Sequence, residues 1–237
     1  MHFPAKIDKN ALNALQTVVF EGKIEEICTT EQAQAAIQQL KTYAEVGIDT
    51  ETRPSFKKGT SYPVSLLQVS TLTVCYLFRL NQIKDLTPIG ELFENKNVKK
   101  IGLSLSDDLR ALTQRIRMTP KECFDIQNMV KDYGIFELSL QKIFAIVFNR
   151  RISKAQRLSN WEQKELTNAQ QLYAATDAWA TLLLYAQLKR ERKISQKEKQ
   201  TIEAELAQQE QERLAHILEQ KELRKLELEK NKHDESI

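Results

Sequence analysis

The chain has 237 residues and a net charge of +3, with 41% hydrophobic and 7% aromatic residues. This length allows one substantial domain with an appendage, and the composition excludes a wholly disordered chain. No apolar run reaches the roughly 18 residues of a membrane-spanning helix, and the first residues lack the pattern of a secretory signal. We therefore expect a cytoplasmic protein with free thiols at its three widely spaced cysteines, Cys28, Cys75 and Cys123.

The predicted elements alternate between strand and helix along the chain. Residues 22–30 predict a strand, and a helix follows for which Thr29 or Thr30 is the expected N-cap. A second strand is expected to end at residue 52, and further strands are expected at 64–71, 73–80, 98–105 and 123–130. Further helices are expected at 85–95, 106–116, 138–148 and 166–192. This order predicts an α/β fold in which helices flank a mixed sheet.

Residues 194–237 have no Gly or Pro and are dominated by Glu, Lys, Gln, Leu and Ala. One interpretation is a helix that binds a protein partner or self-associates. The other is a charged, solvated helix that frays and is partly disordered, which the absence of a heptad pattern favours. We predict three parts: an N-terminal extension at 1–24, a catalytic domain at 25–193 and a charged helical tail at 194–237. Residues 189–237 have 12 Lys/Arg and 12 Asp/Glu, so the positive excess lies in residues 1–188 and permits a polyanionic partner.

Two acidic residues, Asp49 and Glu51, directly follow the apolar run "VGI" in a predicted strand. Side chains two residues apart in a strand point to the same face. Two adjacent carboxylates repel each other and are costly to desolvate, so a cation is expected between them. A divalent metal ion is the obvious candidate.

Two further acids occupy unusual positions on predicted helices. In "SDDLRAL", Asp107 and Asp108 can simply complement the helix dipole. Helical geometry places Asp108 beside the apolar face and turns Asp107 toward solvent, so we select Asp108. In "LYAATDAWA", Tyr173 and Asp177 are four residues apart and share one face of an apolar helix. A Tyr–Asp hydrogen bond without catalytic purpose would also explain that pair.

Together, Asp49, Glu51, Asp108 and Asp177 predict a shared site for two divalent cations, Mg²⁺ or Mn²⁺, because all the ligands are oxygen atoms. The three histidines, His2, His216 and His233, lie outside the predicted core. Two metal ions about 4 Å apart form a template for phosphoryl displacement.

The motifs "DTET", "IGLSLSDDLRAL" and "YAATDA", in this order, resemble those of the DEDD superfamily of 3′–5′ exonucleases, which have the ribonuclease-H-like fold. Over residues 25–188 the chain is most similar to the ribonuclease D and Werner-helicase exonuclease branch. The resemblance implies hydrolysis of terminal phosphodiester bonds at the 3′ end of DNA or RNA, with release of nucleoside 5′-monophosphates. Its tyrosine subclass (DEDDy) is implied, since Leu172 stands where the other subclass has His.

The resemblance also implies a role for each residue of these motifs. Asp49 would bridge both metals, Glu51 and Asp177 would complete the shell of the first, and Asp108 would reach the second through water. Tyr173 would orient the attacking water.

Five residues near these motifs are candidates for substrate binding: Phe56, Lys57, Lys58, Lys154 and Arg157. The alternative is an ordinary exposed loop with solvated cations. Nearby Trp161 is expected in the core. For the whole chain, the alternative to an exonuclease is a catalytically silent nucleic-acid-binding protein, or a scaffold that acts through the C-terminal helix.

Overall fold

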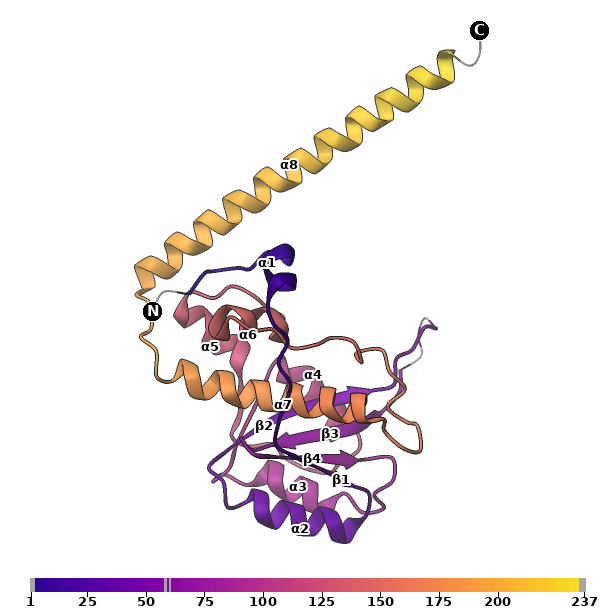
Figure 1. Cartoon of the computed structure of the whole chain (residues 1–237), viewed down its shortest axis with the longest axis vertical. Coiled ribbons are helices and arrows are strands. Elements are labelled where there is room, and N and C mark those ends of the chain that lie inside the picture. The colour runs from indigo at the N-terminus through magenta and orange to yellow at the C-terminus, as the bar shows by residue number, and fades with distance from the viewer. Residues whose placement is uncertain (1–2, 58, 60, 235–237) are drawn as a thin grey trace. The chain divides into compact units, whose positions relative to one another are not determined.

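The computed structural model describes residues 3–57, 59 and 61–234. The chain divides into two compact units, one ending at Lys193 and the other beginning at Ile194 (Figure 1). The first unit contains the sheet and all helices except α8, which covers Gln196–Asp234. Each unit is described separately.

The first unit is built on one six-stranded sheet, in the order β1-β4-β3-β2-β5-β6. The strands are β1 (Lys23–Ile27), β2 (Glu45–Thr52), β3 (Val64–Ser70), β4 (Val74–Arg79), β5 (Lys99–Gly102) and β6 (Cys123–Asp125). Strands β2, β3 and β4 form an antiparallel meander, and parallel strands lie on both sides of it. The predicted mixed sheet is therefore confirmed.

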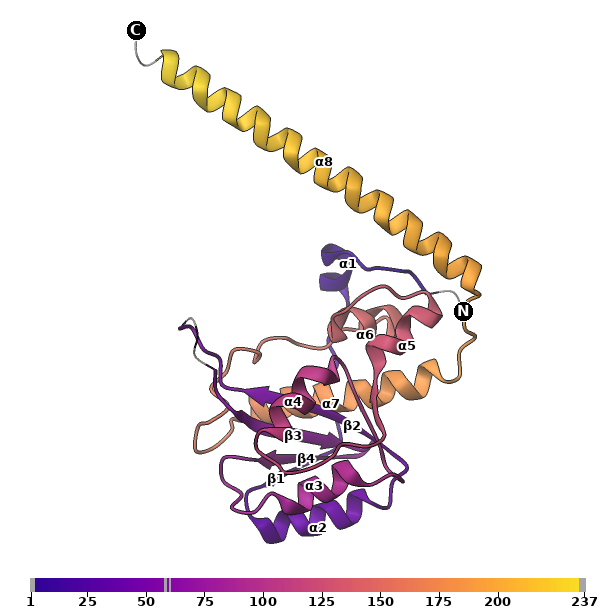
Figure 2. The same cartoon turned by 180° about the vertical axis from the view of Figure 1, so that it is seen from behind.

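Helices cover both faces of this sheet. Helices α2 (Thr30–Leu40), α3 (Thr87–Glu94) and α4 (Leu105–Thr113) share one hydrophobic core with it. On the opposite face lie α5 (Ile126–Val130), α6 (Leu140–Phe148) and the long α7 (Asn168–Leu188). In Figure 1 α7 passes in front of the sheet, and in Figure 2 α4 is in front and α7 behind.

Polar caps fix where the main helices begin. Thr29 accepts a hydrogen bond from the backbone N–H of Gln32, whose side chain accepts one from the N–H of Thr29, so Thr29 is the N-cap of α2. Thr167 and Gln170 form the same arrangement at the start of α7. The cap at Thr167 thus fixes the residue at which α7 begins.

Helix α7 lies unusually close to β2 because residue 47 is glycine. A Cβ atom at Gly47 would stand 2.0 Å from the carbonyl oxygen of Ala178 and 2.9 Å from Oγ1 of Thr181. The missing side chain lets the helix backbone rest directly on the strand. This contact places Asp177, the residue before Ala178, beside the second half of β2.

The prediction of a strand over residues 123–130 is wrong for its second half. Only Cys123–Asp125 is extended, and Ile126–Val130 forms α5. The reason is Asp125, whose carboxylate accepts hydrogen bonds from the N–H groups of Gln127, Ser104 and Leu105. One side chain therefore caps the first turns of both α5 and α4.

The N-terminal segment contains a helix that the sequence did not predict, α1 (Lys9–Ala14), which Asp8 caps. Phe3 is buried in the core, and the N–H of Phe20 donates to the hydroxyl of Thr176 on α7. A short 3₁₀ helix, η1 (Lys131–Tyr133), follows α5. The segment before β1 therefore packs on the same unit as the sheet.

The second unit is the single helix α8, in which Leu214, Ile217 and Leu218 are exposed. Among the described residues, no helix combines the length and the apolar character needed to cross a bilayer. Cys28, Cys75 and Cys123 are all free thiols, as expected.

Candidate active site

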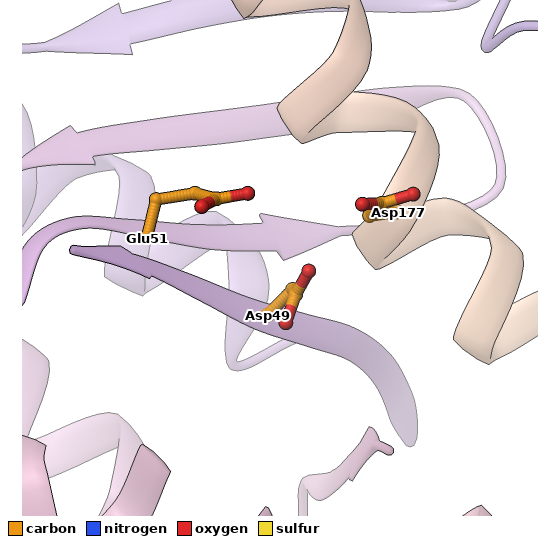
Figure 3. A group of neighbouring side chains, drawn as sticks. All are labelled: Asp49, Glu51 and Asp177. Atoms are coloured by element: carbon orange, nitrogen blue, oxygen red, sulfur yellow. The ribbon is translucent and has the colours of Figure 1, made fainter. Parts of the chain in front are cut away.

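Three carboxylates from two elements meet above the sheet. Asp49 and Glu51 project from the same face of β2, and Asp177 projects toward them from α7 (Figure 3). Each offers an oxygen atom, and these atoms lie within 4.8 Å of one another. The convergence predicted for these three acids is therefore present in the structure.

The three carboxyl groups of this cluster all have raised pKa values, so they are harder to ionise than free carboxyl groups. Burial, reinforced by the charge of neighbouring acids, raises the pKa of Asp49 well above its usual value and raises the pKa of Glu51 to about 10. Burial raises the pKa of Asp177 to about 7, against the opposing effects of Tyr173 and Lys154. Like charges at this separation cannot all be carried without a compensating cation.

The donor set fits a divalent metal ion. The cluster offers only carboxylate oxygens, which hard cations such as Mg²⁺ and Mn²⁺ prefer over softer metals. His216 lies on α8 in the other unit, whereas His2 lies outside the described residues and the side chain of His233 is not described. The acidic cluster is therefore compatible with binding of a divalent cation.

The fourth predicted acid, Asp108, lies next to this group but is not part of it. Its carboxylate accepts a hydrogen bond of 2.5 Å from the hydroxyl of Thr50, which points to the other face of β2 from Asp49. Its charge nevertheless raises the pKa of both Asp49 and Glu51. Asp107 is exposed and pairs with Arg110, so the helix geometry correctly identified which acid faces solvent.

Tyr173 lies one turn before Asp177 on α7, as the sequence predicted. The Tyr173 hydroxyl lowers the pKa of Asp177, whereas burial and the charges of Asp177 and Glu51 raise the pKa of Tyr173. The tyrosine ring packs near Trp161, with ring centroids 6.0 Å apart. Trp161 is fully buried, which confirms its expected place in the core.

Among the described candidates for substrate binding, Lys154 lies near the acids. Its charge lowers the pKa of Asp177, and its Nζ donates to Oγ of Ser139 at 2.8 Å. Arg157 is exposed in the same loop. The segment between α6 and α7 thus supplies a cation near Asp177.

The loop after β2 holds the other candidates. Phe56 is 87% exposed, and with Lys57 it lines an open cavity of about 530 Å³ that also includes Arg53 and Leu158. Lys58 lies outside the described residues. None of the three acids of the carboxylate cluster is among the described residues that line this cavity.

Sequence reasoning missed two polar neighbours of the cluster, Thr50 and Gln68. Thr50 binds Asp108, and Gln68 on β3 lies directly across from Asp49 in the strand register. The available signal was a lone glutamine within the otherwise apolar run "LLQV". Pairing it with Asp49 requires the register of β2 and β3, which the sequence does not supply.

A family model described as "3'-5' exonuclease" matches residues 24–193 of this chain. The chain belongs to the 3′–5′ exonuclease family. This exonuclease-family chain is 31% identical over 150 residues to the mouse bifunctional 3′-5′ exonuclease/ATP-dependent helicase WRN, covering 60% of this chain and 11% of that protein. It is 30% identical over 154 residues to ribonuclease D of Desulfotalea psychrophila, covering 64% of this chain and 40% of the relative. The chain thus spans less than half the length of either relative.

Solved structures share the fold of this family member. The EXO domain of Aedes aegypti Nibbler matches with a TM-score of 0.66 and 18% identity, over 75% of this chain and 92% of that one. Escherichia coli RNase D matches with a TM-score of 0.64 and 18% identity, over 76% and 46% of the two chains. The mixed sheet flanked by helices is therefore the ribonuclease-D-like arrangement expected from the motifs.

Proposed function

We propose that this member of the 3′–5′ exonuclease family hydrolyses the terminal phosphodiester bond at the 3′ end of DNA or RNA and releases nucleoside 5′-monophosphates. The observation that carries the proposal is the convergence of Asp49, Glu51 and Asp177 within 4.8 Å in a chain of this family. Three acids at this separation need divalent cations, and such cations suit the displacement of an oxygen at phosphorus.

Asp49, Glu51 and Asp177 would hold one cation, and Asp49 would hold a second that Asp108 reaches through water, Mg²⁺ or Mn²⁺ in both cases. When bound, the pair supplies Lewis-acid stabilisation of the charge that develops on the scissile phosphate and the leaving oxygen. The raised pKa values of the acids support this assignment, because each carboxylate gains most from a neighbouring cation when burial makes its charge costly.

Tyr173 orients the attacking water by donating a hydrogen bond to it. Burial and the nearby charges of Asp177 and Glu51 raise the pKa of the tyrosine, so its hydroxyl stays protonated at neutral pH and acts as a donor. Its packing against Trp161 restrains the ring. Tyr173 therefore positions the nucleophile and does not act as a general base.

Lys154 and Arg157 bind the phosphates next to the scissile bond, and Phe56, Lys57 and Lys58 contact the strand farther along. The position of Lys154 near Asp177 supports the first assignment. The exposure of Phe56 supports stacking on a base, which is sequence-tolerant. The substrate class includes RNA because similar proteins are named ribonuclease D, and one solved relative is a Trypanosoma brucei RNase D complex with RNA.

The exposed leucines of α8, Leu214 and Leu218, support a contact between this helix and a protein partner or a second copy of the chain. This contact is separate from the catalytic unit, since the first compact unit ends at Lys193.

The direct test uses 3′-labelled single-stranded DNA, duplex DNA and RNA, each with Mg²⁺, Mn²⁺ or EDTA. We expect labelled mononucleotides from at least one substrate with either metal and none with EDTA. Asp49→Ala should remove this activity, whereas Asp107→Ala, which alters an exposed acid of the same motif region, should keep it. Cleavage that survives EDTA or the Asp49→Ala change would overturn the mechanism. Metal binding without any product would favour a silent nucleic-acid-binding protein.

A further inference from the structure

Gln68 lies in the middle of β3 and is fully buried, as is the whole of that strand. The strand register places it directly opposite Asp49 on β2 and opposite Leu77 on β4. Residues directly opposite each other in antiparallel strands point to the same face, with Cβ atoms about 5 Å apart. Gln68 therefore lies beside Asp49 on the face that α7 covers.

Both polar atoms of the Gln68 side chain, Nε2 and Oε1, lack a hydrogen-bond partner among the described residues. Buried amides in proteins are nearly always hydrogen-bonded, so an amide without a partner requires an explanation. Two side chains next to Gln68 offer no hydrogen-bonding group, because both are leucines. Leu77 lies opposite it on β4, and Leu66 packs in an apolar cluster with Tyr173 and Ala174. Asp49, which lies opposite Gln68 on β2, is a polar neighbour on the same face of the sheet.

We propose that Gln68 is a positioning residue for Asp49: its amide N–H, unpartnered in this structure, donates a hydrogen bond to the Asp49 carboxylate when the divalent cations bind and holds it toward them. The inference rests on the metal site of the proposed function. Asp49 needs such support more than the other acids, because it is the carboxylate assigned to both cations.

The chemistry of an amide suits this task. A lysine or arginine at position 68 would neutralise Asp49 and compete with the cations, and an aliphatic residue would leave the carboxylate free to rotate. A neutral donor restrains the carboxylate without removing its charge. Groups that orient metal ligands in this way typically change metal affinity by 10- to 100-fold when they are replaced.

The test is Mn²⁺ binding by the full-length protein, measured from the electron paramagnetic resonance signal of free Mn²⁺. In Gln68→Met, a change of similar volume, we expect the affinity to fall about 10- to 100-fold. The metal-free melting temperature should stay the same or rise, because the substitution removes an unpartnered buried amide. Gln68→Leu is a second variant of the same kind, with the same expected result.

Leu66→Met is the matched control. Residue 66 is also fully buried, lies on the same face of β3 and stands opposite Glu51, and the substitution changes no hydrogen-bonding group. It should bind Mn²⁺ as the parent does. In cleavage assays, the Mn²⁺ concentration for half-maximal rate should rise in Gln68→Met, while the rate at saturating Mn²⁺ stays near that of the parent.

Unchanged Mn²⁺ affinity in Gln68→Met and Gln68→Leu would overturn the inference. So would a fall in the metal-free melting temperature, since that would mean that Gln68 supports the fold and not the metal site. The readout is binding, so it separates this inference from the proposed function. A parent protein that binds Mn²⁺ through Asp49 but cleaves nothing would refute the exonuclease and leave the role of Gln68 testable.

Discussion

Asp177 determines the electrostatic character of the site, because it brings a third carboxylate to a strand that already carries two. The spacing of Asp49 and Glu51 in the sequence is enough to place those two on one face. The third acid arrives only through the packing of α7 on β2. The resulting pKa shifts all run upward, so the metal-free site favours protonation.

These shifts predict how the stability of the metal-free protein depends on pH. The folded-state pKa values of Asp177, about 7, and Glu51, about 10, lie above the value of about 4 for unfolded carboxyl groups. The folded protein therefore holds protons that the unfolded chain has released, and this stabilisation is lost as pH rises through the folded values. In EDTA, the melting temperature should fall between pH 5 and pH 9, and it should fall less in Asp177→Asn. Parallel pH profiles for parent and variant would contradict this account.

The adjacent acids of α4 offer a comparison at single-residue resolution. Asp108 binds Thr50 beside the cluster, whereas Asp107 is exposed and pairs with Arg110. We expect Asp108→Asn to lower the cleavage rate at limiting Mg²⁺ by about 10- to 100-fold, because we propose that the residue supports a second cation. Asp107→Asn should cleave at the parental rate. Equal losses in both variants, measured under the same conditions, would show that the two acids act only by complementing the dipole of α4.

At the scale of elements, the contact between α7 and β2 assembles the site, and Gly47 makes this contact possible. In Gly47→Ala the new methyl group would collide with the backbone oxygen of Ala178, so the helix must move away from the strand. We expect a loss of about 1–3 kcal/mol in the free energy of unfolding and weaker Mn²⁺ binding, since Asp177 moves with the helix.

Gly90 on α3 is the control for that substitution. A Cβ atom there would meet its nearest neighbour, Cγ2 of Ile116, at 3.3 Å, and alanine favours a helix over glycine by about 1 kcal/mol. Gly90→Ala should unfold in urea near the parental midpoint and bind Mn²⁺ normally. If Gly47→Ala behaves in the same way, then close packing of α7 on β2 does not position Asp177.

Most elements of the first unit follow from local sequence, and the exceptions have local physical causes. Alternating and apolar runs identified the strands of the meander, and Thr29 was one of two N-caps considered for α2. The apolar residues of 126–130 suit a strand as well as a helix, and the bonds from Asp125 decide between them. Helix α1 has six residues and only one buried side chain, Leu12. It therefore lacks the periodic pattern of apolar residues from which a helix is predicted.

The candidate site was predictable from sequence only in part. Pairs of residues with fixed local spacing, such as Tyr173 and Asp177, share a face by geometry alone. Contacts across strands, such as Gln68 beside Asp49, depend on a register that no local pattern determines. Motif order, through its resemblance to a family, supplied the connection between the distant acids.

At the scale of the whole molecule, the catalytic assignment concerns the unit that ends at Lys193, and α8 forms a unit of its own. We therefore expect a protein shortened to residues 1–193 to melt within about 2 °C of the sheet-containing unit in the full chain. Its cleavage rate should match that of the full chain, because no acid of the site lies beyond Asp177.

The same truncation tests the proposed contact of α8. Light scattering should give more chains per particle for the full chain than for the shortened protein at equal molar concentration if α8 self-associates. Equal assembly states would remove self-association and leave a protein partner as the proposal for this helix. A loss of cleavage on truncation would contradict the assignment of catalysis to the first unit.

The most direct measurement is anomalous diffraction from crystals of the full-length protein grown with Mn²⁺. We predict two anomalous peaks about 4 Å apart, one within reach of Asp49, Glu51 and Asp177 and the other between Asp49 and Asp108. Neither peak should be present in crystals of Asp49→Ala grown under the same conditions. Mn²⁺ bound elsewhere, with none at the three converging carboxylates, would contradict the account.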